Sequence, residues 1–247
     1  MSYEPLLSVN NLNVWYDRKY LVLSGLCLEL GTHEVVGLIG LNGAGKTTFI
    51  KTIAGLLPGF SLDHLWWKGQ EFASGGRTGL FRDPDFKKER YVVFDQDSSF
   101  MYFTFREYLD YVAAAYGVSR PDVSHLVKGF HFEAFQDVLL KELSTGNLKK
   151  ARLITGFALR PKLLFLDEPV NGLDFSSTEF LYELMRGYKA YGTILFSSHV
   201  LESICLTSQR VLVLESGRIR REFIGEDIEA KHIREVLWDE SHDEGLC

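Results

Sequence analysis

The sequence lacks a long apolar run, has few cysteines and carries no excess of basic charge. No stretch approaches the roughly 18 consecutive apolar residues of a membrane span, so any membrane role is expected to come through a partner. The segment Met1–Pro5 has neither the basic nor the apolar region of a secretory signal. The three cysteines are widely spaced and show no metal-ligand pattern, which favours reduced thiols in a cytosolic protein.

The net charge of −6 does not favour a nucleic-acid partner. The excess of negative charge lies in the last segment of the sequence, because residues 226–247 carry eight acidic and two basic side chains. We expect a short amphipathic helix over 226–238, followed by a solvated end. With 247 residues, of which 46% are hydrophobic, the chain can bury the core of one large α/β domain or of two small ones.

A glycine-rich turn at Gly40–Thr48 has the pattern G-x-x-x-x-G-K-T. The apolar run Val35–Ile39 predicts a buried strand before it, and Phe49–Leu57 predicts a helix after it, which is the context that a phosphate-binding loop requires. Lys46 can then reach the β- and γ-phosphates of a nucleotide, and the Thr47 hydroxyl can bind Mg²⁺. The alternative is a glycine-rich turn with an incidental lysine. The expected phosphate-binding residues are Gly40, Asn42, Gly43, Ala44, Gly45, Lys46, Thr47 and Thr48.

Three later apolar runs predict buried strands, at Tyr91–Phe94, Leu163–Leu166 and Thr193–Ser198. Each run leads into polar residues, and ligands of open α/β sheets bind at the carboxyl ends of strands. The polar residues are Asp95-Gln96-Asp97, Asp167-Glu168 and His199.

These strand ends supply the chemistry for a triphosphate. Asp167 is expected to hold Mg²⁺ and Glu168 to polarise an attacking water. Gln96 can bind Mg²⁺ or position a water through its amide oxygen, and His199 can donate to a phosphate oxygen. Solvated strand ends and an inert histidine are the alternatives.

Residues 98–143 have a helical pattern that is unusually rich in aromatic residues. Thr104 is expected to cap a helix that ends before Gly117, and 129–143 to form a further helical segment. Core packing is the default interpretation of the aromatic side chains, and an exposed patch that receives a partner is the alternative. The residues concerned are Phe100, Tyr102, Phe103, Phe105, Tyr108 and Tyr111. Residues 73–90 are expected to form a solvated loop.

Two further features are weak taken alone. Leu143–Asn147 opens a helix that continues to Leu159, which indicates a second anion site or a plain helix cap. Tyr16 ends the first of two predicted antiparallel strands, and its ring can stack on a flat heterocycle or serve as an ordinary strand aromatic.

The motifs and their order along the chain resemble those of an ATP-binding subunit of an ABC transporter. The resemblance covers nearly the whole chain. The matching elements are Walker A (Gly40–Thr48), Walker B with the catalytic glutamate (Leu163–Glu168), the Q-loop (Gln96), the signature (Leu143–Asn147), the D-loop (Asn171–Asp174), the switch histidine (His199) and the adenine-stacking aromatic (Tyr16).

The resemblance implies an α/β fold: a P-loop NTPase core with a mostly parallel sheet, an N-terminal antiparallel β subdomain and an α-helical signature subdomain. The ABC domain would span 1–225, with the helical subdomain at about 98–155, and 226–247 would form an acidic helix and tail. The implied cofactors are ATP and Mg²⁺. The implied partners are a second ATP-binding subunit, identical or closely related, and an integral membrane permease, which would place the chain at the cytoplasmic face of the cell membrane.

The resemblance also implies roles for single residues. Two subunits would sandwich two ATP molecules, with Ser144 and Gly146 contacting the γ-phosphate that the partner's Lys46 holds. Asp174 is implied as a further nucleotide-binding residue, and Tyr16 as the residue that stacks on the adenine. The implied catalytic residues are Glu168 as general base, His199, Gln96 and Lys46.

The chain departs from the family pattern at four positions. Thr145 replaces glycine, Asn147 replaces glutamine, Val170 stands where threonine is common, and Asp95 stands where proline is frequent. The segments Thr104–Leu109 and Ser197–Glu202 are similar to exporters of drugs, antimicrobial peptides or lipids. A soluble ABC ATPase and a weakly hydrolysing regulatory subunit are the alternatives.

Overall fold

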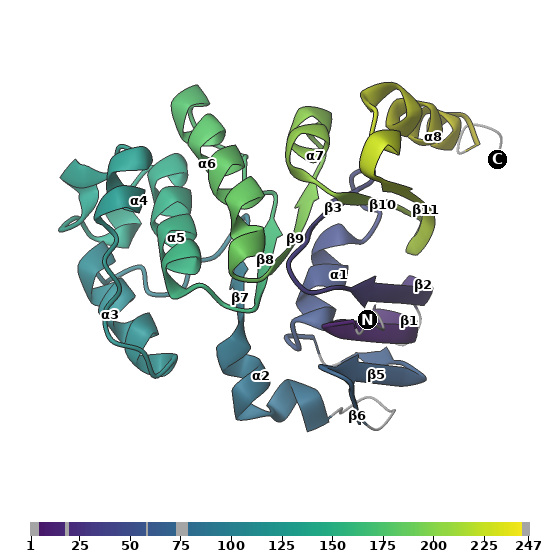
Figure 1. Ribbon diagram of the computed structural model, residues 1–247, viewed down its shortest axis with the longest axis horizontal. Helices are drawn as coiled ribbons and strands as arrows, with labels where there is room; N and C mark the ends of the chain where they lie inside the picture. The colour runs from purple at the N-terminus through teal and green to yellow at the C-terminus, as the bar shows by residue number, and fades with distance from the viewer. Residues whose placement is uncertain (1–4, 18–19, 58, 73–78, 244–247) are drawn as a thin grey trace.

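The computed structural model describes residues 5–17, 20–57, 59–72 and 79–243, which form two β-sheets flanked by helices (Figure 1). The larger sheet has the strand order β11-β10-β3-β9-β8-β7 and is parallel except for the β10–β11 hairpin. Its strands are β3 (Val35–Ile39), β7 (Arg90–Val93), β8 (Leu163–Asp167), β9 (Thr193–Ser198), β10 (Arg210–Glu215) and β11 (Arg218–Ile224). This arrangement confirms the predicted mostly parallel sheet.

Both faces of the parallel sheet are covered, because its strands are hydrophobic on both sides. In β8, Leu164 and Leu166 belong to one buried cluster, whereas Leu163 and Phe165 belong to a second cluster on the opposite face. This alternation follows from the two-residue period of a strand. The helices that cover the faces are α1 (Lys46–Ile53), α2 (Pro84–Glu89), α3 (Phe105–Ala115), α4 (Ser124–Gly129), α5 (Thr145–Leu159), α6 (Phe175–Gly187), α7 (Leu201–Thr207) and α8 (Ala230–Asp243).

The N-terminal sheet is antiparallel, as predicted, and has the order β2-β1-β5-β6 with β4 paired to β1. Helix α1 lies between the two sheets, and its Phe49, Ile50 and Ile53 share one buried cluster with residues of both. The strands are β1 (Leu7–Asp17), β2 (Tyr20–Leu30), β4 (Phe60–Ser61), β5 (His64–Trp67) and β6 (Gln70–Phe72).

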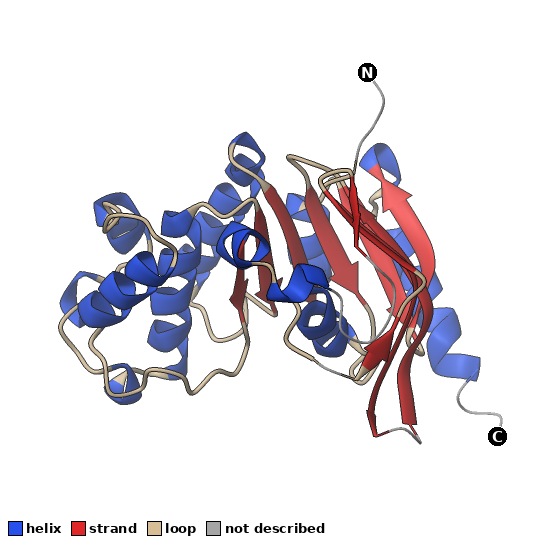
Figure 2. Cartoon of the chain, turned by 90° about the horizontal axis from the view of Figure 1, so that it is seen from below, coloured by secondary structure: helices blue, strands red, loops and turns tan. Residues whose placement is uncertain are grey.

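Helices α3, α4 and α5 gather at the end of the molecule opposite to the antiparallel sheet (Figures 1 and 2). Thr104 caps α3 as predicted: its hydroxyl accepts from the Glu107 amide, and the Glu107 carboxylate accepts from the Thr104 amide. The aromatic residues divide, because Phe105 and Tyr108 are buried whereas Tyr102 and Tyr111 are 78% and 53% exposed. Core packing is therefore confirmed for Phe105 and Tyr108, whereas a partner-binding role of the exposed rings stays a prediction.

Several element boundaries differ from the sequence-based expectation. Residues 79–89 form the short helices η1 (Gly79–Arg82) and α2 rather than a loop, because the Asp83 carboxylate caps α2 and Pro84 suits its first turn. Residues 73–78 of the expected loop lie outside the described residues. The segment 129–143 contains only the turns η2 (Glu133–Phe135) and η3 (Leu140–Glu142), while α4 precedes it.

The C-terminal helix α8 begins at Ala230, after the turn η5 (Gly225–Asp227), and is anchored by the buried side chain of Ile233. The helix therefore begins and ends later in the chain than the expected range 226–238. A further turn, η4 (Tyr188–Ala190), extends α6. Within the described ranges, no helix is long and apolar enough to cross a membrane.

Candidate nucleotide-binding site

The loop between β3 and α1 leads into a helix N-terminus that no side chain caps. Gly43 and Gly45 have φ values of 87° and 103°, which glycine adopts readily and other residues do not. Gly45 is the N-cap of α1, and no side chain caps this helix. Its first backbone N–H groups therefore remain available to an anion, and the helix dipole favours negative charge at the same place. The loop fits a phosphate group.

Lys46 is buried beside this loop. Its Nζ donates to the carbonyl oxygens of Gly40, at 2.7 Å, and Leu41, at 3.2 Å, and lies 3.8 Å from Glu168 Oε1. Burial lowers the pKa of Lys46, although the charges of Glu168 and Asp167 act in the opposite direction. A phosphate would add negative charge next to this ammonium group and favour its charged form.

Thr47, Asp167 and Ser197 form a row of oxygen atoms. The Thr47 hydroxyl donates to Asp167 Oδ2 at 2.9 Å, and the Ser197 hydroxyl donates to Asp167 Oδ1 at 2.7 Å. Asp167 is 3% exposed, so these hydrogen bonds compensate for the burial of its charge. Hydroxyl and carboxylate oxygens are ligands that suit Mg²⁺, which takes its other ligands from water and phosphate.

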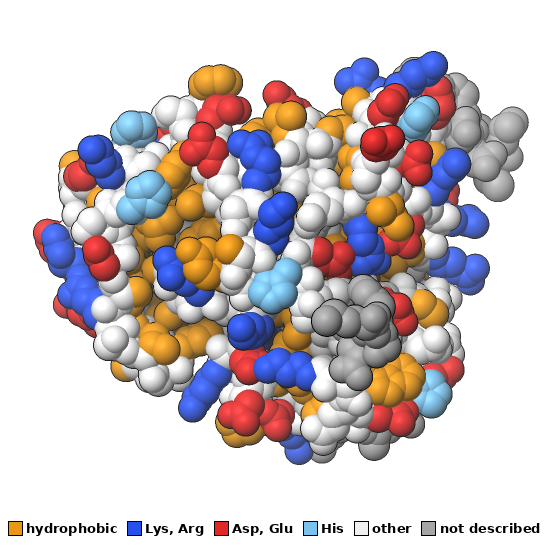
Figure 3. Space-filling view, viewed as in Figure 1, with side chains coloured by type: hydrophobic (Ala, Val, Ile, Leu, Met, Phe, Trp, Pro, Cys, Tyr) orange, Lys and Arg blue, Asp and Glu red, His pale blue; other side chains and the backbone are white. Residues whose placement is uncertain are grey.

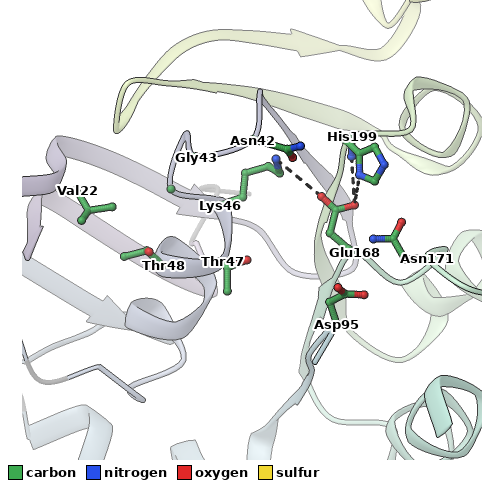
Figure 4. A pocket seen from close by; sticks show the side chains of 11 residues that line it. Val22, Asn42, Gly43, Lys46, Thr47, Thr48, Asp95, Glu168, Asn171 and His199 are labelled. Carbon is green, nitrogen blue, oxygen red and sulfur yellow. Dashed lines mark hydrogen bonds and ion pairs between the residues drawn. The ribbon is translucent and has the colours of Figure 1, made fainter. Parts of the chain in front are cut away.

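Glu168 lies between a cation and a histidine (Figure 4). Its Oε2 is 2.8 Å from His199 Nδ1 and also accepts from the His199 amide at 3.3 Å, while Oε1 faces Lys46. Glu168 is the residue directly after β8 and has a φ of 48°, a left-handed conformation that is uncommon outside glycine. The predicted strand-end acid and histidine therefore meet at one place.

These groups surround a pocket of about 440 Å³ (Figure 4). Its lining residues are Val22, Asn42, Gly43, Gly45, Lys46, Thr47, Thr48, Asp95, Glu168, Asn171 and His199. Thr47, Glu168 and His199 were expected here from the sequence. Asp95, Asn171 and Val22 were not singled out for the site, although Asp95 and Asn171 each stand in a motif that was.

Several expected residues are not among those that line this pocket, namely Gly40, Ala44, Asp167, Gln96 and Tyr16. Gln96 is exposed and lines a neighbouring pocket of about 590 Å³ together with Thr145 and Arg152. The side chain of Tyr16 is 62% exposed, and its hydroxyl lies 3.2 Å from Thr48 Oγ1, at the edge of the site.

The signature residues form the start of α5. Ser144 is its N-cap and accepts a hydrogen bond from the Asn147 amide at 3.3 Å. Gly146 packs against the Gly172 carbonyl so closely that a Cβ would overlap with it. Asp174 caps α6 and accepts from Lys150 Nζ at 2.6 Å. Ser144, Gly146 and Asp174 are absent from the lining of the 440 Å³ pocket in their own chain.

The comparisons with known proteins agree with this geometry. The family model described as ABC transporter matches residues 23–171. The candidate ABC transporter ATP-binding protein AlbC of Bacillus subtilis (strain 168) is 36% identical, over 92% of this chain and 95% of that protein. The energy-coupling factor transporter ATP-binding protein EcfA2 of Clostridium perfringens (strain 13 / Type A) is 31% identical, over 86% and 78% respectively.

Solved structures of the same fold are also similar. A structure of an ATP-binding subunit of an ABC transporter has a TM-score of 0.77 and 29% identity, covering 97% of this chain and 98% of that one. The ATP-binding cassette MJ0796, solved as a dimer in a post-hydrolysis state with ADP and Pi, has a TM-score of 0.75 at 17% identity, covering 88% and 98%, and supports the fold alone. The chain therefore belongs to the ABC transporter family, as an ATP-binding subunit with ATPase activity.

Proposed function

We propose that this subunit hydrolyses ATP with Mg²⁺ at the 440 Å³ pocket and that Glu168 is the general base. The observation that carries the proposal is the position of the Glu168 carboxylate, which lies between Lys46 and His199 at the wall of that pocket. Bound Mg²⁺ would neutralise phosphate charge, and Thr47 and Asp167 would hold it.

Each residue of the pocket has a separate task in this proposal. The α1 terminus and Lys46 bind the phosphate oxygens, so the triphosphate is fixed relative to the wall that carries Glu168. Glu168 accepts the proton of the attacking water. His199 holds one oxygen of Glu168 and can donate to a phosphate oxygen. Gln96 lines the neighbouring 590 Å³ pocket, so it acts in hydrolysis only if its loop turns toward the 440 Å³ pocket.

The active form is a dimer that encloses ATP between two chains. Ser144 is exposed at the N-terminus of α5, a helix end that suits an anion, and it lies outside the pocket of its own chain. A second copy, or a closely related chain, would supply Ser144 and Gly146 to the γ-phosphate. The dimeric MJ0796 cassette supports this arrangement as an analogy of fold.

The membrane partner is a permease that docks next to the neighbouring pocket. That pocket is lined by Phe94, Met101, Leu143 and Leu148 along with polar residues, and the exposed rings of Tyr102 and Tyr111 stand near it in sequence. Figure 3 shows hydrophobic side chains gathered over the helical end of the molecule. Docking would hold the subunit at the cytoplasmic face of the cell membrane, where it powers export of a drug, peptide or lipid. The similarity of Thr104–Leu109 and Ser197–Glu202 to exporters favours this direction.

The test compares ATP hydrolysis of the wild-type chain with that of Glu168→Gln. We expect the variant to bind ATP, to lose hydrolysis by at least about a hundredfold and to accumulate as an ATP-bound dimer. Glu183→Gln is the matched control, because Glu183 is an exposed glutamate on α6. Wild-type turnover by Glu168→Gln would show that the base is another group.

Co-purification tests the transport role. The chain, expressed with a multi-span membrane protein if one is encoded by the neighbouring gene, should purify in a complex whose ATPase activity responds to cargo. Uptake and efflux measured in vesicles of that complex would distinguish export from import. A chain that purifies without any membrane protein and associates with ribosomes instead would contradict the proposal.

A further inference from the structure

Helix α5 carries three buried cations within four residues, and each binds a carboxylate of a loop. Lys149 binds Asp95 at 2.8 Å, and Lys150 binds Asp174 at 2.6 Å. Arg152 binds Asp97, and also donates to the Asp97 carbonyl at 2.6 Å. Because an unpaired buried charge is costly, these contacts tie α5 firmly to the loop after β7 and to the loop before α6.

Lys149 differs from the other two cations because it also reaches Glu168. Its Nζ donates to the main-chain carbonyl oxygen of Glu168 at 3.1 Å, in addition to Asp95 Oδ1. The Lys149 side chain is 2% exposed, whereas the Asp95 side chain, which lines the pocket, is 35% exposed. One buried ammonium group thus holds two parts of the pocket wall, Asp95 and the backbone of Glu168, which Figure 4 shows next to each other.

The backbone of Glu168 needs such support. A non-glycine residue in the left-handed region is strained and persists only when its surroundings fix it. The Glu168 amide donates to Ser197, to both its Oγ at 3.0 Å and its carbonyl at 3.2 Å. The Glu168 carbonyl accepts from Lys149 and, at 3.3 Å, from the Asn171 amide. These contacts set the direction in which the carboxylate leaves the chain.

We propose that Lys149 is a positioning residue for ATP hydrolysis: together with Asp95, it fixes the backbone of Glu168 so that the carboxylate faces the attacking water. The inference rests on the proposed role of Glu168 as general base. It also gives Asp95, which stands where the family frequently has proline, a defined partner and a defined task. Lys149 itself touches neither ATP nor water in this mechanism.

The first test measures hydrolysis in Lys149→Met, Asp95→Asn and the double variant. Methionine keeps most of the length of the buried chain and removes the ammonium group. We expect kcat to fall about tenfold in Lys149→Met, with the KM for ATP within about twofold, because a misplaced catalytic group slows the chemical step. The double variant should be no slower than the slower single variant, since both act through one contact. Lys128→Met, on the exposed face of α4, is the control.

The second test separates positioning from a general structural effect. In the Glu168→Gln background the carboxylate to be positioned is gone, so adding Lys149→Met should leave the fraction of ATP-induced dimer in size-exclusion chromatography unchanged. Loss of that dimer would mean that Lys149 only holds α5 in place, and would overturn the proposal. So would a Lys149→Met kcat within twofold of wild type, or additive losses in the double variant.

The outcomes remain interpretable if one variant does not fold. Asp95→Asn/Lys149→Met removes both charges of the pair together and leaves no buried ammonium group unpaired, so it carries the kinetic test if Lys149→Met alone is unstable in thermal unfolding. A wrong assignment of the base is recognised separately, because Glu168→Gln would then hydrolyse ATP at the wild-type rate whatever Lys149 does.

Discussion

The hydroxyl of Thr47 and the carboxylate of Asp167 lie 2.9 Å apart although 120 residues separate them in the chain. Thr47 belongs to the first turn of α1 and Asp167 is the last residue of β8, so the contact joins the phosphate loop to the strand end. A hydroxyl that donates to a carboxylate in the absence of metal can turn its lone pair to Mg²⁺ when the ion is bound. The pair therefore brings together two oxygen groups that suit the proposed Mg²⁺ site.

Replacement of Thr47 tests this metal site. Thr47→Val keeps the shape of the side chain and removes the hydroxyl, so the Mg²⁺ concentration that gives half-maximal ATPase activity should rise at least about tenfold. Thr47→Ser keeps the hydroxyl and should stay close to the wild type. A titration of activity with Mg²⁺ at saturating ATP measures the effect. An unchanged Mg²⁺ requirement in Thr47→Val would exclude the hydroxyl as a ligand.

Tyr16 provides a prediction on the binding of the adenine ring of ATP. Its ring is largely exposed beside Thr48, which leaves a face open to a flat heterocycle. Loss of stacking costs about 1–3 kcal/mol, so Tyr16→Ala should raise the Kd for ATP by roughly fivefold or more. Tyr16→Phe keeps the ring and should bind ATP within about twofold of wild type. Calorimetry with ATP measures both, and Tyr20→Ala, an exposed tyrosine on β2, is the control. Equal affinity of Tyr16→Ala and wild type would argue against stacking.

The main features of the site could be predicted because they depend on local pattern. A buried parallel strand has a continuous apolar run, and such strands end at one edge of the sheet, so the residues that follow them meet. Asp167, Glu168 and His199 were found in this way. The phosphate loop was found because its glycines, lysine and threonine are contiguous in the sequence.

The remaining features depend on side-chain directions and on contacts between distant segments. Asp95 and Gln96 are neighbours after the same strand, and the sequence does not tell which one faces the phosphate pocket; the buried Lys149 selects Asp95. Helix α2 was mistaken for loop because its six residues are too short for a helical period, although Asp83 before Pro84 is a start signal that could have revealed it.

Asp174 gives a prediction on the pH dependence of stability. The pKa of Asp174 is held well below its usual range. The hydrogen bond from Lys150 is the largest cause, and the hydrogen bond from the Ser177 amide is the next. A depressed pKa in the folded state stabilises the fold above the unfolded pKa of about 3.9, and this contribution is lost as the pH falls toward the folded pKa.

Asp174→Asn keeps a good helix cap and an amide oxygen that can accept from Lys150, and it removes the negative charge. Because the Asp174 side chain is half exposed, we expect a loss of at most about 1 kcal/mol in the free energy of unfolding at pH 7. The difference between wild type and variant should shrink as the pH is lowered from 5 toward 3 (about one unit either side of 3.9), as measured by urea unfolding. A difference that is constant over this range would show that the charge is not responsible.

Thr145 and Asn147 are predicted to weaken the contact of this helix terminus with the ATP held by a second chain. Thr145 is exposed in the first turn of α5, where its branched side chain stands beside Ser144, and Asn147 is one methylene shorter than glutamine. In a Glu168→Gln background, Thr145→Gly/Asn147→Gln should therefore form the ATP-bound dimer at an ATP concentration several-fold lower, because the phosphate can approach the helix terminus more closely. Thr145→Ala, which removes only the branch, should lie between the two. Glycine costs up to about 1 kcal/mol in a helix, so thermal unfolding is measured in parallel. If the dimer forms at the same ATP concentration in all three proteins, these two departures from the family pattern do not weaken closure.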